Sequence, residues 1–205
     1  MAKVDLARRA EIGREKRART RAQILEAGAM LLAERPPEAL TVDAVVETAG
    51  VAKGTFYYHF KSIDELAAAV GDKLGESFDE LLAPARLDLP DPIARISFAL
   101  TEFLKKAIAD STWARLVVQS AQAPTELGRS IRANLKTDLA EALVQGRLAV
   151  QDIDLAADIV IGISVQVMRG TLQRKPPPDL APQALDAVLR AIGAVPQPRD
   201  RKTRR

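Results

Sequence analysis

The stretch from Thr41 to Leu66, TVDAVVETAGVAKGTFYYHFKSIDEL, predicts two short helices joined by a tight turn. Thr41 is a favourable N-cap, and the helix that follows it has an inward apolar face made of Val42, Val45, Val46 and Ala49. Gly50 suits the left-handed end of this helix. A second helix is expected from Lys53 to Phe60, and the next one is expected to begin near Ser62. The stretch therefore has the form of a helix-turn-helix.

The second of these helices carries the candidate chemistry. At about 100° per residue, Phe56 and Phe60 share a buried face, and polar side chains point outward. Glycine permits close backbone approach, while hydroxyls, imidazole and lysine can contact phosphates or base edges in the major groove. We therefore predict DNA contacts by eight residues: Thr41, Lys53, Gly54, Thr55, Tyr57, Tyr58, His59 and Lys61.

Several of these residues also have a purely structural interpretation. Thr41 could do no more than cap its helix, although capping is compatible with a phosphate contact. Tyr57 and Tyr58 could be half-buried supports. His59 could equally be a structural residue or a phosphate contact. The combination of residues, and no single one, favours DNA binding.

The same stretch resembles the helix-turn-helix signature of the TetR family of transcriptional regulators. The resemblance lies in the capping threonine, the Ala-Gly-Val turn, the Gly-Thr-aromatic-Tyr helix and the His-Phe exit. The segment Ile24 to Arg35 is similar to the family's first helix, so the close similarity covers roughly residues 15 to 70. Beyond it, only the number and order of helices agree. The resemblance implies a dimer that binds operator DNA and senses a small molecule.

Two positions depart from the family's pattern. Pro36 and Pro37 stand where a glycine commonly follows the first helix, so the approach to the second helix could be shifted. The lysine that often contacts a phosphate just inside the fourth helix is Ile63 here. Its role could pass to Lys61 or to N-terminal cations that enter a minor groove, namely Arg14, Lys16, Arg17 and Arg19.

Helical signals continue through the rest of the chain, and no strand-period run competes with them. A first helix is expected from about Glu15 to Glu34. Later helices are expected from Pro92, after a cap at Asp91, to about Ala109, from a cap at Ser111 or Thr112, from Pro124 to about Leu148, from Asp152 or Asp154 to Leu172, and around Leu185 to Ile192. The predicted fold is all-α with about nine helices. Its expected parts are a basic flexible arm (1–14), a three-helix helix-turn-helix DNA-binding domain (15–61), a larger helical ligand-sensing and dimerisation domain (62–195) and a basic tail (196–205).

Charge and composition are consistent with a cytoplasmic protein that binds nucleic acid. The net charge is +3, but residues 1–21 carry eight Lys/Arg against three Asp/Glu, and residues 199–205 carry five against one. These cations can attract a polyanion, although the C-terminal group could be only a solubilising tail. Neither a secretory signal nor an uncharged run of membrane-spanning length is recognised, because runs such as Ile159 to Met168 are too short.

The helix after Asp152 is apolar nearly all round, so it needs burial on two sides. It could be the central core helix of a monomer. The resemblance instead implies that the last two helices pair with their copies across a two-fold axis to form a homodimer. The expected interface residues are Ile159, Ile163, Val167, Leu185, Val188, Leu189 and Ile192.

The resemblance also implies a cavity for a small-molecule effector among the later helices. Apolar and aromatic side chains with a few polar groups are typical of such cavities, although aromatic residues at helical spacing can be plain core. The candidate lining residues are Phe78, Phe98, Phe103, Trp113, Gln119, Gln122 and Met168. The sequence does not identify the effector.

Two rival functions are weaker. An enzyme would need a nucleophile with a base, and His59, the single histidine, lies on the presumed DNA-facing helix. No nucleotide-binding or hydrolase motif occurs, and with no cysteine a thiolate zinc site is excluded, so neither catalytic residues nor a metal or other cofactor is expected. The second is a protein-interaction module that has lost DNA binding. It is disfavoured because the outward-facing polar residues of the reading helix are intact, namely Lys53, Thr55, Tyr58 and Lys61.

Overall fold

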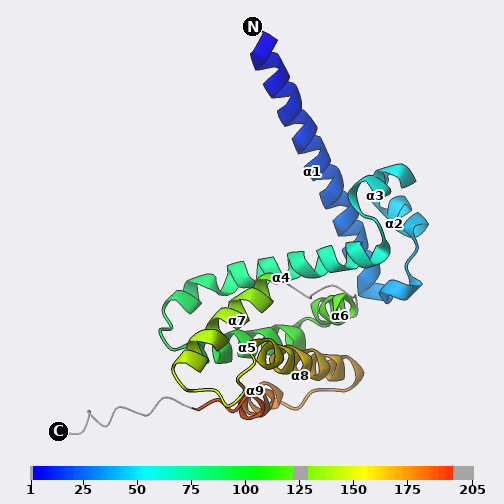
Figure 1. Cartoon of the computed structure of the whole chain (residues 1–205). Coiled ribbons are helices and arrows are strands. Elements are labelled where there is room, and N and C mark those ends of the chain that lie inside the picture. Colours follow the sequence, from blue (N-terminus) through cyan, green and yellow to red (C-terminus); the bar gives the residue numbers. More distant parts are fainter. Residues whose placement is uncertain (1, 122–128, 196–205) are drawn as a thin grey trace, which may run out of the picture. The chain divides into compact units, whose positions relative to one another are not determined.

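The computed structural model describes residues 2–121 and 129–195, and these residues form helices and loops without strands. Nine α-helices and one short 3-10 helix lie in the described ranges (Figure 1). Their bounds are α1 Ala2–Glu34, η1 Pro37–Ala39, α2 Val42–Ala49, α3 Lys53–His59, α4 Ile63–Leu87, α5 Pro92–Ala109, α6 Ser111–Ser120, α7 Arg129–Val144, α8 Ile153–Gln173 and α9 Leu180–Ala191. The all-α prediction is confirmed.

The chain divides into two compact units. The N-terminal unit comprises Met1–Lys73 with Arg115–Leu127, and the C-terminal unit comprises Leu74–Ala114 with Gly128–Arg205. The division falls inside α4 and inside α6, so both helices contribute to both units. The functional limits expected at residues 61 and 195 stay a prediction.

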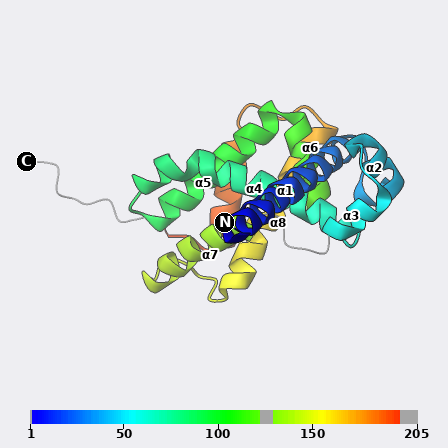
Figure 2. The same cartoon turned by 90° about the horizontal axis from the view of Figure 1, so that it is seen from above.

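α1 is longer than predicted. It runs as one helix in both views, from Ala2 to Glu34, so the expected start near Glu15 was wrong (Figures 1 and 2). Apolar periodicity detects only a segment with a buried face, which here begins at Ile24. The preceding residues are rich in Ala, Arg, Glu and Lys, which favour a helix without a buried face. The predicted flexible arm is thus helical from residue 2.

The N-terminal unit is organised around a small apolar core. Its fully buried members include Ile24 and Leu32 on α1, Val45 on α2, Phe56 on α3 and Leu66 on α4. Gly28 lets α1 lie close to α4, because a Cβ there would come within 2.8 Å of a Leu66 methyl carbon. This packing holds α2 and α3 against α1.

The C-terminal unit has its core between α5, α7, α8 and α9. The buried cluster includes Leu100, Leu139, Val160 and Val188, one from each helix. Asp91 caps α5 and Asp152 caps α8, as their positions before the helices predicted. α6 is capped by Asp110, whose carboxylate accepts a hydrogen bond from the Trp113 amide at 2.9 Å.

Two helix boundaries differ from the prediction, and a third is not tested. Ser111 is the first residue of α6 and not its cap, because the preceding Asp110 supplies the capping carboxylate. α7 ends at Val144 because the chain turns through Gly146, which has a φ of +68°. Part of the expected start of α7, before Arg129, lies outside the described residues.

Candidate DNA interface and sensing residues

The turn between α2 and α3 has the geometry that the sequence predicts. The Thr41 hydroxyl accepts a hydrogen bond from the Ala44 amide at 3.2 Å and so caps α2. Gly50 has a φ of +64°, which few side chains tolerate, and the next amide, of Val51, donates to the Val46 carbonyl at 3.0 Å. The chain therefore leaves α2 in a tight left-handed turn that directs α3 across it.

Two phenylalanines anchor α3. Phe56 and Phe60 are 0% and 1% exposed, and their ring centroids lie 5.9 Å apart. The Arg21 guanidinium of α1 lies over the Phe60 ring at 4.9 Å. Because one face of α3 is held in this way, Tyr57 and Tyr58 remain 53% and 69% exposed on the other sides.

Gly54 leaves the exposed face of α3 open. A Cβ built at this position would have no atom of the described residues within 4 Å. Thr55 beside it is half-buried, and Lys61 beyond the helix is exposed. Exposed backbone with hydroxyls and a cation around it is suited to close approach by another molecule.

Lys53 is less free than the sequence suggested. Its ammonium group lies 2.8 Å from a carboxylate oxygen of Asp43 on α2, and both side chains are more than half exposed. The hydrogen bond and charge of Asp43 raise the pKa of Lys53 above its ordinary value, so this lysine stays charged. A base or phosphate contact by Lys53 must therefore replace an existing ion pair. Sequence reasoning missed Asp43, although it lies on the exposed side of α2.

His59 is half-buried at the end of α3, and its ring lies 5.0 Å from that of Tyr58. Burial, together with the positive charge of Arg21, lowers the pKa of His59 below its ordinary value of 6.5. The imidazole is accordingly neutral at pH 7. It can donate one hydrogen bond, and it gains a charge only when an anion approaches or the solution becomes acidic.

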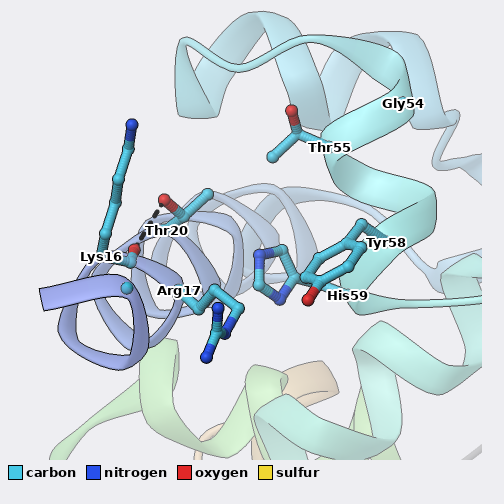
Figure 3. Close-up of a pocket in the computed structure, with 8 residues that line it drawn as sticks. Lys16, Arg17, Thr20, Gly54, Thr55, Tyr58 and His59 are labelled. Atoms are coloured by element: carbon cyan, nitrogen blue, oxygen red, sulfur yellow. Dashed lines mark hydrogen bonds between the residues drawn. The ribbon is translucent and has the colours of Figure 1, made fainter. Parts of the chain in front are cut away.

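A groove of about 440 Å³ separates α1 from α3 (Figure 3). It is lined by Gly13, Lys16, Arg17 and Thr20 from α1 and by Gly54, Thr55, Tyr58 and His59 from α3. Four predicted DNA-contacting residues of α3 thus form one wall. Of the four N-terminal cations considered in the sequence, Lys16 and Arg17 line the groove, whereas Arg14 and Arg19 do not.

Three of the predicted effector-cavity residues form an aromatic cluster in the C-terminal unit. The ring centroids of Phe78, Phe103 and Trp113 are 5.1 to 5.7 Å apart, and the Lys106 ammonium lies 5.3 Å from the Trp113 ring. All three aromatic side chains are buried. The cluster joins α4, α5 and α6.

The other cavity candidates are not part of this cluster. Phe98 is half-buried and takes part in none of the ring contacts of the described residues, while Met168 is fully buried on α8. Gln119 belongs to the N-terminal unit, and its buried side-chain oxygen has no hydrogen-bond partner among the described residues. Gln122 lies outside the described residues.

The predicted interface residues separate into two groups. Val188 and Ile192 are 0% exposed in the chain's own core, so they offer no surface to a partner in this structure and their assignment is corrected. The other five are half-buried at the edge of that core: Ile159, Ile163, Val167, Leu185 and Leu189. The spacing of apolar residues in α9 could not show that Val188 is buried and Leu189 is not. Neighbouring residues on one apolar stripe differ in burial only once the helix has packed.

α8 retains much apolar surface. Within its most apolar stretch of 18 residues, only 28% of the residues are buried inside the chain. By length and composition alone α8 could cross a membrane, which counting uncharged runs had missed. This is weak evidence for a membrane, because a helix that packs against another chain has the same composition.

Comparisons with known proteins agree with this geometry. Residues 24–70 match the family described as bacterial regulatory proteins, tetR family, and residues 91–198 match the tetracyclin repressor-like C-terminal domain. The chain is similar to the HTH-type transcriptional regulator TtgR of Pseudomonas putida, with 32% identity over 104 residues, which is 50% of each protein. It is 25% identical over 172 residues to the uncharacterized HTH-type regulator YhgD of Bacillus subtilis, covering 76% of this chain and 86% of YhgD.

Solved structures extend the similarity to most of the chain. The crystal structure of RolR in complex with the ligand resorcinol matches with a TM-score of 0.71 and 27% identity, covering 88% of this chain and 90% of RolR. The structure of SmeT, a repressor of a Stenotrophomonas maltophilia multidrug efflux pump, has a TM-score of 0.60 at 22% identity, covering 87% and 96%, and supports the fold alone. The alignment with TtgR spans only about half of that regulator.

The anchored α3, its open outer face and the turn at Gly50 define a helix-turn-helix DNA-binding protein. With family models that match residues 24–70 and 91–198, the chain belongs to the TetR family of transcriptional regulators. Members of this family are DNA-binding regulators and not enzymes, as the sequence analysis predicted.

Proposed function

We propose that this protein is a cytoplasmic, dimeric repressor that binds a palindromic operator through α3 and is released by a small molecule. The observation that carries the proposal is the outer face of α3. There, Gly54 exposes bare backbone beside Thr55 and Tyr58, while the buried Phe56 anchors the opposite side of the helix. A helix presented in this way is suited to the major groove.

The apolar surface of α8 supports the dimer. Ile159, Ile163 and Val167 recur every four residues and are only half-buried, as are Leu185 and Leu189 on α9. A second copy of the chain can cover both stripes about a two-fold axis. The two α3 helices would then read half-sites about 34 to 36 Å apart.

The aromatic cluster supports an aromatic effector. Phe78, Phe103 and Trp113 present ring faces and edges at the separations that favour aromatic packing, and RolR, a relative in fold, was crystallised with resorcinol. An aromatic effector would take the place of part of this packing. Phenols are therefore the first compounds to screen by thermal shift.

Operator binding can be tested with the DNA upstream of the protein's own gene. In an anisotropy titration, Tyr58→Ala should weaken specific binding, and Lys61→Ala should weaken binding to all DNA and reduce the salt slope by about one. Lys175→Ala, which removes an exposed lysine in the C-terminal unit, is the matched control. Unchanged operator affinity in both Tyr58→Ala and Lys61→Ala would exclude docking of α3 in the major groove. Footprinting relative to the promoter separates repression from activation.

Release by an effector can be tested by linkage. A hundredfold loss of operator affinity corresponds to a coupling free energy of about 2.7 kcal/mol, and saturating operator must weaken effector binding by the same factor. Trp113→Ala should alter the effector response while leaving effector-free DNA binding nearly unchanged. Equal effector affinity with and without operator, measured by calorimetry, would rule out this switch for that compound.

A further inference from the structure

We infer that the groove between α1 and α3 holds the sugar–phosphate backbone of one operator strand, so that α1 is a second DNA-contacting element. The inference rests on the proposed DNA binding and adds an element to it. The N-terminal half of α1 and the outer face of α3 would then contact one strand from two sides.

The chemistry of the groove is that of a polyanion site. Its α1 wall carries the cations Lys16 and Arg17, and its α3 wall carries the hydroxyls of Thr55 and Tyr58 and the imidazole of His59. None of the eight lining residues is acidic. Figure 3 draws these groups on the two sides of the same space. Cations facing hydrogen-bond donors are the usual partners of phosphate oxygens.

The groove is continuous with the proposed reading face. Gly54, Thr55, Tyr58 and His59 belong both to the groove wall and to the set expected to meet DNA. A duplex lying against α3 must therefore bring one of its strands to the mouth of this groove. At about 440 Å³, the groove is many times the roughly 10 to 15 Å³ that a cavity needs to hold one water, which leaves space for a phosphate with its sugar.

The helical state of α1 decides how its cations reach DNA. An α-helix with its side chains is about 10 to 12 Å wide, whereas the minor groove of B-DNA is about 6 Å wide. Because α1 is helical from Ala2, Lys16 and Arg17 cannot enter the minor groove as parts of an extended arm. From a helix beside α3 they are instead placed to contact phosphates at the edge of the major groove. This contact would replace the one lost where Ile63 stands in place of the family's lysine.

The test compares two double variants of full-length protein on the operator. Lys16→Gln/Arg17→Gln removes two charges from the groove, and Arg14→Gln/Arg19→Gln removes two exposed charges from the same helix outside it. We expect at least a tenfold loss of affinity for the groove variant, with the salt slope reduced by about two. The control variant should lose less than threefold. Equal losses in the two variants would overturn the inference in favour of diffuse attraction.

A phosphate scan then identifies the partner. Operator duplexes with one neutral methylphosphonate at a time are titrated with wild type and with the groove variant. At one or two phosphates, neutralisation should lower the affinity of wild type but leave the affinity of the groove variant unchanged. The variant already lacks the cations that contact those phosphates. Full additivity at every phosphate would overturn the inference while leaving operator binding intact. Failure of wild type to bind the DNA specifically would instead refute the proposed function, and this inference with it.

Discussion

At the scale of single residues, two features shape the outer face of α3: the missing side chain of Gly54 and the uncharged ring of His59. Gly54 has no side chain to hold DNA away, and none of the residues that the structure describes fills the space. His59 in the wall of the groove is uncharged near neutrality, because burial and the charge of Arg21 lower its pKa. Each feature gives a direct prediction.

Replacing Gly54 with alanine should separate folding from DNA binding. Stability should be unchanged or higher by up to about 1 kcal/mol, because alanine favours the helix and its Cβ meets no atom within 4 Å. Operator affinity should fall at least tenfold, because the methyl group occupies the space that DNA needs. Urea unfolding and anisotropy measure the two effects. Gly170→Ala in α8, whose Cβ would make only an ordinary contact with Arg174, is the control and should leave DNA binding unchanged.

His59 should make operator binding depend on pH. A nearby phosphate favours the charged imidazole, so binding takes up a proton and affinity rises as the pH falls from about 8 to about 6. His59→Gln should flatten this dependence. Folding responds in the opposite sense: the folded pKa is lowered, so the stability that neutral His59 contributes is present above 6.5 and is lost as the pH falls through the lowered folded pKa. An identical pH profile for wild type and His59→Gln would assign His59 a structural role only.

At the scale of helices, ion pairs in the C-terminal unit hold α4, α5 and α7 together. The Asp138 carboxylate of α7 is 6% exposed and lies 2.6 Å from Arg86 of α4 and 2.7 Å from Arg95 of α5. Arg95 also pairs with Glu141. These long-range pairs join segments about fifty residues apart in sequence.

Asp138→Ala should therefore lower the free energy of unfolding by about 3 kcal/mol, because it leaves two largely buried guanidinium groups without their shared partner. The estimate lies at the lower end of the usual range because Arg86 and Arg95 remain 17% and 16% exposed. Asp186→Ala breaks the exposed pair with Arg190 and should cost no more than about 0.5 kcal/mol. If chemical denaturation showed similar losses in the free energy of unfolding for both variants, the buried ion pairs would stabilise the fold no more than the exposed one.

At the scale of the whole molecule, the proposed activity requires two copies of the chain. Leu155 is 51% exposed, and the half-buried stripe of Ile159, Ile163 and Val167 continues along α8. An apolar helix with this much free surface is stabilised when a second copy removes that surface from water. The prediction at this scale concerns that association.

Ile163→Glu and Leu189→Arg should each produce monomers, because a charge buried without a partner costs several kcal/mol of association. Val144→Glu is the control, since Val144 of α7 is 89% exposed and lies outside the proposed interface. Light scattering gives the molecular mass, and circular dichroism checks that each variant folds. Dimers that persist in both interface variants would place the interface elsewhere.

The sequence by itself determined the order of the helices and the helix-turn-helix. Thr41, Gly50 and the phenylalanines of α3 act through neighbours a few residues away, so local patterns suffice to place the caps, the turn and the buried face. Asp91 and Asp152 marked their helices for the same reason. The start of α1 was missed because an exposed helix has no apolar period to detect.

Only the tertiary structure decided which side chains share a site. Lys16 and Arg17 lie about forty residues before α3 in sequence yet line one groove with it, and Asp43 pairs with Lys53 across the turn. Burial of Val188 in the core, with Leu189 at its edge, was decided by the packing of α9 on α5 and α8. Local propensity and the spacing of apolar residues determine where a helix forms and where its apolar stripe lies. Which part of that stripe is covered depends on long-range contacts, because the free energy of burial belongs to the two packed surfaces together.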